Sequence, residues 1–321
     1  FRMSGAFSLK LNLTKLELFA NGILTISPAG QEIFDLRAQA LLIVEAPDFG
    51  DPLGDPGGFA GKFKLGVNIV LPGVALGGNI EAFINTFGED RTFEVSPFLE
   101  PIVGFSTVEI FAAAPKLNPD FDPLDATSPI LVEDPAATPA AYFAIAARAQ
   151  LKMLGFDVVN DPLIVLDGAF RISVSTVKVE VQAAVGTAIN FPGSADPLFA
   201  LSGSMAFAID QDGFYGRADL NLDAGVTSTE LAAGISLEAD FVLEFNTAAI
   251  AKTIQTFEFD TSTGAKGLTV VERTIAAEML RLSVGGTLSL TTDAGEAVGL
   301  TGRFEFAISP TMLEVQILAQ I

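Results

Sequence analysis

Three oxygen-bearing side chains at alternate positions form the strongest metal-site pattern in this sequence. Asn118, Asp120 and Asp122 have the spacing that opens a Ca²⁺-binding loop. Pro123 stands near the place of the glycine that such a loop needs for its tight turn, and no glutamate closes the loop. Asn, Asp and Pro also form ordinary turns. The pattern therefore predicts a turn first and a calcium site second. Calcium is the one cofactor that the sequence indicates.

Residues for the common kinds of catalysis are missing. The chain has 0 His and 0 Cys, so it lacks the commonest general base and every thiol nucleophile. The glycines at 73, 77 and 78 are not followed by the Lys-Ser/Thr pair of a phosphate-binding loop. Among 39 acidic residues, a glycosidase pair cannot be told from a chance pair. We therefore expect a protein that is not an enzyme.

Charge and aromatic content restrict the partners. Lys and Arg number 18 against 39 Asp and Glu, for a net charge of −21. Such a surface repels nucleic acids and anionic membranes, and it keeps an apolar chain soluble. The 27 Phe residues contrast with 2 Tyr and 0 Trp. Because Phe has no polar atom, we expect the rings to pack in a dry interior or against an apolar ligand.

Hydrophobic residues alternate with polar ones over most of the chain, which is typical of strands with one apolar face. In the first such stretch, Phe7, Leu9, Leu11 and Leu13 fall on one face and Ser8, Lys10 and Asn12 on the other. The fold class predicted is all-β, an elongated stack of antiparallel hairpins with at most one or two short helices. The helices are expected within 248–256 or 272–282, where Ile275, Met279 and Leu282 also fit a helical stripe.

One hairpin pattern is repeated along the chain. The segments that begin at Gly5, Gly168 and Gly302 share Gly-x-Phe followed by alternating aliphatic residues. A repeat of this size cannot bury its own apolar face, so neighbouring repeats must stack around a continuous apolar core or groove. The rings expected to form it are Phe7, Phe63, Phe170, Phe241 and Phe304. Arg171 is expected on the opposite, solvent-facing side.

The predicted organisation has three parts. Residues 1–114 and 141–321 form β-repeat regions, and the Pro- and Asp-rich segment 115–140 is a surface loop or a boundary between them. Both ends of the chain have strand-like patterns. We expect a segment of a longer polypeptide whose ends pair with further repeats, or head to tail with a second copy.

The sequence favours neither kind of membrane-spanning structure. No run of 18 apolar residues exists, so a transmembrane helix is not expected. A transmembrane β-barrel is disfavoured, because its Tyr and Trp girdles are missing.

The Gly-x-Phe hairpins and the segment 241–247 resemble repeat segments of very large secreted bacterial surface proteins. A weaker similarity is to β-groove lipid-transfer proteins of the AsmA and TamB type. The first resemblance implies a non-catalytic structural segment of an extracellular or cell-surface scaffold, fibre or adhesin. The second implies an apolar ligand, such as a lipid, carried along a groove lined by Phe and Leu. Whether the Phe rings pack together or line an open surface decides between them.

Overall fold

The protein is all-β. The computed structural model describes residues 2–27, 32–47, 57–118, 120, 125, 127–153, 162–190, 197–225, 233–259, 268–292, 295–309 and 312–320. The first half holds β1 (Arg2–Leu11), β2 (Lys15–Ile26), β3 (Phe34–Glu45), β4 (Gly58–Leu71), β5 (Val74–Asn85), β6 (Arg91–Glu94), α1 (Glu100–Val103), β7 (Thr107–Ile110), β8 (Lys116–Leu117), β9 (Leu131–Val132) and β10 (Tyr142–Met153). The second half holds β11 (Ile164–Ser175), β12 (Lys178–Asn190), β13 (Pro197–Asp210), β14 (Gly213–Gly225), β15 (Ala233–Asn246), β16 (Lys252–Phe259), β17 (Leu268–Ile275), β18 (Met279–Thr292), β19 (Gly295–Ser309) and β20 (Met312–Gln320).

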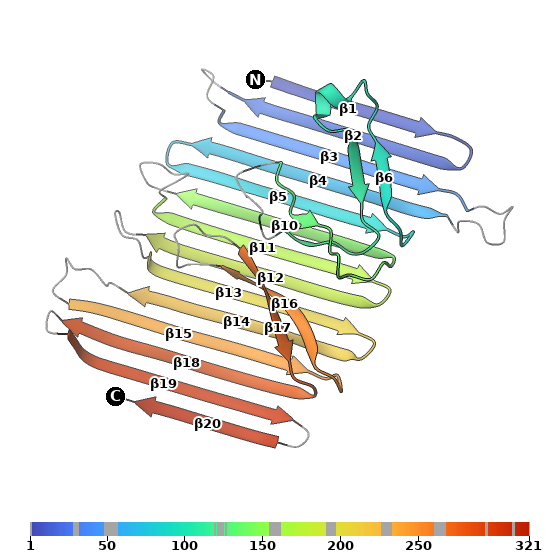
Figure 1. Cartoon of the computed structure of the whole chain (residues 1–321). Helices are drawn as coiled ribbons and strands as arrows, with labels where there is room; N and C mark the ends of the chain where they lie inside the picture. The colour runs from blue at the N-terminus through green and yellow to red at the C-terminus, as the bar shows by residue number, and fades with distance from the viewer. Residues whose placement is uncertain are drawn as a thin grey trace. The chain divides into compact units, whose positions relative to one another are not determined.

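Long strands pair with their neighbours in sequence, as hairpins do. The hydrogen-bonded order is β1-β2-β3-β4-β5-β10-β11-β12-β13-β14-β15-β18-β19-β20 (Figure 1). The three repeated sequence segments coincide with three equivalent hairpins, since Phe7 lies in β1, Phe170 in β11 and Phe304 in β19. The all-β class and the repeated antiparallel hairpins are therefore confirmed.

The chain divides into two compact units, residues 1–151 with 171–179 and residues 152–170 with 180–321. In each unit the chain leaves the sheet once to form a small cover. In unit 1 the connection from β5 to β10 forms the hairpins β6–β7 and β8–β9 and the single turn α1. In unit 2 the connection from β15 to β18 forms the hairpin β16–β17.

The cover of unit 1 buries an aromatic core against one face of the sheet. Phe19 of β2 stacks on Phe93 of β6 with ring centroids 5.4 Å apart, and Phe83 of β5 stacks on Phe111 at 5.6 Å. Ile43, Ile110, Ile130 and Leu131 are also buried. The described residues of the segment 115–140, predicted as a loop or a boundary, thus belong to unit 1, and Leu117, Ile130 and Leu131 contribute to its core.

The cover of unit 2 is built in the same way. Ala206 and Ala208 of β13 and Tyr215 of β14 pack with Ile254 and Ile275 of the β16–β17 hairpin. The expected helices at 248–256 and 272–282 are wrong, because these residues form parts of β16, β17 and β18. The apparent helical stripe arises where β17 turns directly into β18. Glu278, in that turn, has a positive φ of 49°.

Two Asn-Thr pairs mark the points where the chain leaves the sheet. The Asn246 side-chain NH₂ donates to the carbonyls of Ile250 and Ala276, each at 2.9 Å, and its oxygen accepts from the Ala248 N–H. Asn85 repeats this arrangement in unit 1, donating to the carbonyls of Glu89 and Phe111. Both Asn side chains are buried. Each cover is therefore fixed to the sheet at its root.

The threonine of each pair bridges to the neighbouring strand. Thr247 Oγ1 accepts from the N–H of Phe214 and donates to its carbonyl. Thr86 does the same with Phe59. In both places a glycine precedes the phenylalanine, and a Cβ on Gly213 would lie 2.6 Å from the threonine hydroxyl. The bridge therefore requires glycine there.

Candidate functional site: an uncovered apolar sheet face

One face of the sheet in unit 1 carries only apolar side chains. The strand registers place Leu18 beside Leu9 and Leu42, and Phe63 beside Ala40 and Ala82. Extended through these registers, the face consists of Phe7, Leu9, Leu11, Leu16, Leu18, Ala20, Gly22, Leu24, Ile26, Phe34, Leu36, Ala38, Ala40, Leu42, Val44, Phe59, Gly61, Phe63, Leu65, Val67, Ile69, Leu71, Val74, Leu76, Gly78, Ile80, Ala82 and Ile84. We call it the apolar face of unit 1.

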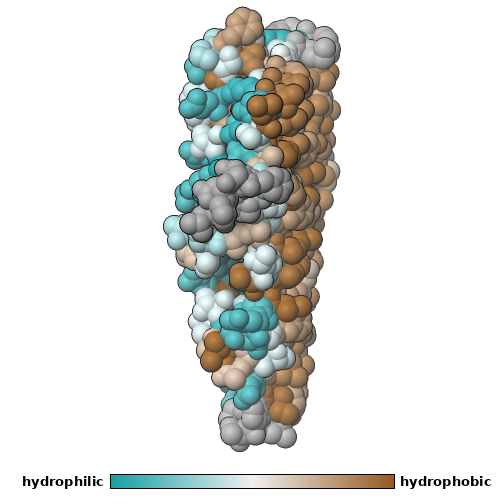
Figure 2. Space-filling view, turned by 90° about the vertical axis from the view of Figure 1, so that its right-hand side faces the viewer, coloured by the Kyte–Doolittle hydropathy of each residue, from teal (hydrophilic) through white to brown (hydrophobic). Residues whose placement is uncertain are grey.

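The cover elements lie on the other face, so the apolar face is open. Phe63 and Ile80 on the apolar face are 43% and 40% exposed, whereas Phe83, on the covered face, is 1% exposed. In the upper part of Figure 2, which shows unit 1, hydrophobic residues gather mainly along one edge of the view and hydrophilic ones along the other.

Unit 2 has an apolar face of the same kind. It consists of Leu201, Gly203, Met205, Phe207, Ile209, Phe214, Gly216, Ala218, Leu220, Leu222, Ala239, Phe241, Leu243, Phe245, Leu280, Leu282, Val284, Gly286, Leu300, Gly302, Phe304, Phe306, Ile308, Val315, Ile317 and Ala319. Their neighbours along the strands face the other way and include the ion pairs of Arg217 with Glu244 and of Arg281 with Glu305. The period of two thus separates the charges from the apolar residues.

Rows of small residues cross the strands of both apolar faces. In unit 1, Gly5, Gly22 and Ala38 lie in register across three strands. Larger residues flank this row along the strands: Leu24 and Leu36 lie on one side of it, and Leu18 and Leu42 lie on the other side, past Ala20. In unit 2, Ala239, Gly286, Gly302 and Ala319 form such a row beside Phe241, Val284, Phe304 and Ile317. A Cβ placed on Gly22 would meet nothing within 4 Å. The face is therefore furrowed across the strand direction.

The five predicted rings all belong to these faces or to the same side of β11. Phe7, Phe63, Phe170 and Phe304 are exposed, and Phe241 is partly exposed. They are therefore surface residues and not core anchors. The expectation for Arg171 is also reversed: Phe170 is 39% exposed while Arg171 is 5% exposed, with its Nε donating to the Pro115 carbonyl at 2.9 Å. The reason is that the covers bury the polar face.

The calcium pattern at 118–122 forms a turn in the part that the structure describes. Asn118 Oδ1 accepts from the Asp120 N–H at 3.0 Å, as in an ordinary Asx turn, while Asp122 lies outside the described residues. In another acidic turn, Asp210 and Asp212 both hold the Lys252 ammonium, at 2.8 and 2.6 Å. Within the described ranges, no group of three or more acidic residues is arranged to hold a metal ion.

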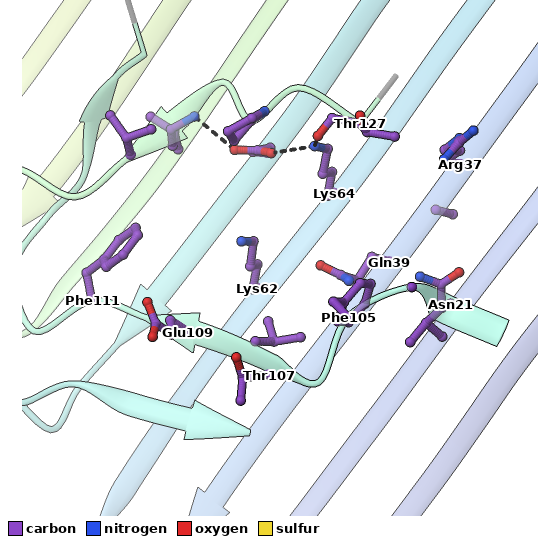
Figure 3. Close-up of a pocket in the computed structure, with 18 of the residues that line it drawn as sticks. Asn21, Arg37, Gln39, Lys62, Lys64, Phe105, Thr107, Glu109, Phe111 and Thr127 are labelled. Carbon is purple, nitrogen blue, oxygen red and sulfur yellow. Dashed lines mark hydrogen bonds and ion pairs between the residues drawn. The ribbon is translucent and has the colours of Figure 1, made fainter. Parts of the chain in front are cut away.

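A second feature lies between the sheet and the cover of unit 1. A cavity of about 790 Å³ opens there, lined by side chains of β2 to β5 below and by β7, β9 and their flanking loops above (Figure 3). Two lysines of β4, Lys62 and Lys64, reach into it from the polar face. Sequence reasoning missed this site, because the cover that forms its roof has no periodic pattern.

Comparison with known proteins assigns no family. No family model and no curated protein matches the chain. One solved structure, from the FpvAI–pyocin S2 complex, aligns with 99% of this chain at 8% identity and a TM-score of 0.25. The alignment spans 39% of that protein. Among the described residues, none of the helical structure has the length and apolar character needed to cross a bilayer.

Proposed function

We propose that this chain is a non-catalytic segment of an extracellular or cell-surface protein, and that its apolar faces hold the acyl chains of lipids. The observation that carries the proposal is the placement of the covers. In each unit the cover shields the polar face and leaves the apolar one open. A protein that needed only a stable core would gain more by covering the apolar face.

The size of the apolar face exceeds what isolated soluble proteins expose. The paired strands β1 to β5 of unit 1 are spaced about 4.8 Å apart, and ten residues of each rise about 3.4 Å apiece, so the face covers roughly 800 Å². The largest apolar patch of a typical monomer is about 300–600 Å² and is often functional. A face of this size therefore calls for an apolar partner.

The composition of the face favours hydrocarbon over protein. Protein interfaces are typically about 57–65% apolar and carry about ten hydrogen bonds. Here every side chain in the register of the unit 1 face is Gly, Ala or a larger apolar residue, with no hydrogen-bonding group. Acyl chains need none. The net charge of −21 favours lipids with zwitterionic or uncharged headgroups over anionic ones.

Strand β20 offers a matched pair of variants to test the proposal. Ile317 lies on the apolar face and is 76% exposed, while Leu318 lies on the opposite face and is 55% exposed. Ile317→Asp places a charge among the acyl chains and should weaken binding of phosphatidylcholine at least tenfold, since burying an unpaired charge is costly. Leu318→Asp should leave binding unchanged. Flotation with phosphatidylcholine vesicles measures both, and equal binding by the two variants would contradict the proposal.

A further inference from the structure

Lys62 is a largely buried cation for which the described part of the chain supplies no counter-ion. Its side chain enters the cavity of unit 1, and its ammonium lies over the Phe83 ring, 4.8 Å from the ring centroid. Among the described residues no carboxylate lies within ion-pair distance of Lys62 and no acceptor bonds to it. Burial lowers the pKa of Lys62, against the opposing influence of the Glu81 carboxylate. The protonated form is thus poorly compensated.

Lys64, two residues along the same strand, shows how the fold satisfies a buried ammonium. It donates to the carbonyls of Thr127 at 2.6 Å and Ser128 at 2.9 Å, and it pairs with Glu81 at 3.4 Å. Glu81 is completely buried and also accepts from the Leu131 N–H at 2.9 Å. Both lysines line the same cavity, but of the residues that the structure describes three supply acceptors to Lys64 and none supplies one to Lys62.

The walls of the cavity combine charge with apolar surface. Arg37, Lys62 and Lys64 bring positive charge, while Glu81, Glu109 and Glu133 bring negative charge. Arg37 pairs with Asp35 at 2.8 Å, and Glu81 serves Lys64. Glu109 attracts the Lys62 ammonium only from beyond contact distance. The remaining walls include Ile23, Val103, Phe105, Val108, Phe111 and Leu131. Figure 3 shows Phe111 and Phe105 on either side of Lys62.

We propose that this cavity binds a small monocarboxylate with an apolar body, whose carboxylate pairs with Lys62 while its body packs on Phe105 and Phe111. The volume of about 790 Å³ falls within the range of about 300–1,000 Å³ usual for small-molecule sites. A carboxylate supplies the missing acceptors to the ammonium, and the apolar walls select against a bare inorganic anion. The site is independent of the apolar face of unit 1, since Lys62 and Phe63 lie on opposite sides of β4.

The test uses 3-phenylpropionate and its neutral amide, 3-phenylpropionamide, titrated into the whole chain by calorimetry. We expect the carboxylate to bind at least tenfold more tightly than the amide, because a hydrogen bond to a charged group is worth about 1.5–3 kcal/mol and 1.4 kcal/mol is a factor of ten. Acetate, which lacks the apolar body, should bind at least tenfold more weakly than 3-phenylpropionate. Equal binding of acid and amide, or no binding of the acid at millimolar concentration, would overturn the proposal.

Variants then locate the site. Lys62→Met should lose the preference for acid over amide, and Lys62→Arg should keep it. Lys116→Met, which removes a lysine outside the cavity that pairs with Asp134, serves as the control and should bind like the parent chain. Phosphatidylcholine binding by Lys62→Met should be unchanged, so failure here and failure of the lipid proposal are distinguishable. Full retention of the acid preference in a folded Lys62→Met chain would refute the assignment.

Discussion

At the scale of single residues, burial in this protein follows the covers and not hydrophobicity. Phe19 and Phe170 are both strand phenylalanines, but Phe19 is fully buried against Phe93 and Phe170 lies open. Phe19→Ala should therefore lower the free energy of unfolding by about 3–5 kcal/mol, the usual cost of truncating a buried ring. Phe170→Ala should cost less than Phe19→Ala, because 39% of the Phe170 side chain is already exposed and less apolar area is lost. Urea unfolding of the two variants measures the difference, and a similar large loss for both would show that the apolar face is packed in solution.

At the scale of elements, the Asn-Thr pairs anchor the covers. Asn246→Ala leaves the carbonyls of Ile250 and Ala276 and the N–H of Ala248 without the side chain that satisfies them. The loss should be about 1–3 kcal/mol, and hydrogen exchange should quicken first in β16 and β17. Asn221→Ala, at an exposed asparagine of β14, is the control and should change neither. Unchanged exchange in β16 and β17 of the Asn246 variant would show that the hairpin is held by its core alone.

The sequence predicts the strands well because a period of two is a strong local signal. It indicates the apolar faces for the same reason, but it does not reveal which face is covered. That depends on the short, non-periodic strands β6 to β9, whose buried Phe93, Ile110 and Leu131 resemble loop residues in the sequence. The helical stripe at 272–282 gave a wrong prediction of a helix, because two strands meet there at the tight turn that contains Glu278. The repeated Asn-Thr at 85–86 and 246–247 was a usable sign of the two departures from the sheet.

The Lys62 cavity was beyond sequence reasoning for a related reason. Lys62 and Lys64 alternate with apolar residues, as surface lysines of a strand commonly do. The roof of the cavity comes from residues about 40 to 70 positions further along the chain. It buries Lys62 and supplies hydrogen-bond acceptors to Lys64. A buried charge is decided by tertiary contacts that local patterns do not contain.

At the scale of the whole molecule, our proposal that lipid occupies the apolar faces competes with a second hypothesis, that a second copy of the chain covers them. The outermost strands β1 and β20 stand at the ends of the hydrogen-bonded order, so head-to-tail pairing of edges also stays a prediction. Edge pairing leaves the apolar faces open. A second copy stacked face to face would close them. Whether the apolar faces become covered only when lipid is added therefore distinguishes these arrangements.

Single-cysteine labelling tests the account most directly, because the chain has 0 Cys and needs no background substitution. An environment-sensitive fluorophore is attached at Phe63, Leu166 or Val284, exposed positions on the apolar side, and at Asp240 or Arg303, exposed positions on the polar side. On addition of phosphatidylcholine, we predict a shift to shorter wavelength at the first three positions and none at the other two. Labels that are already in an apolar environment without lipid, in a chain that sediments as a dimer, or labels that respond equally on both sides, would contradict lipid binding by the apolar face.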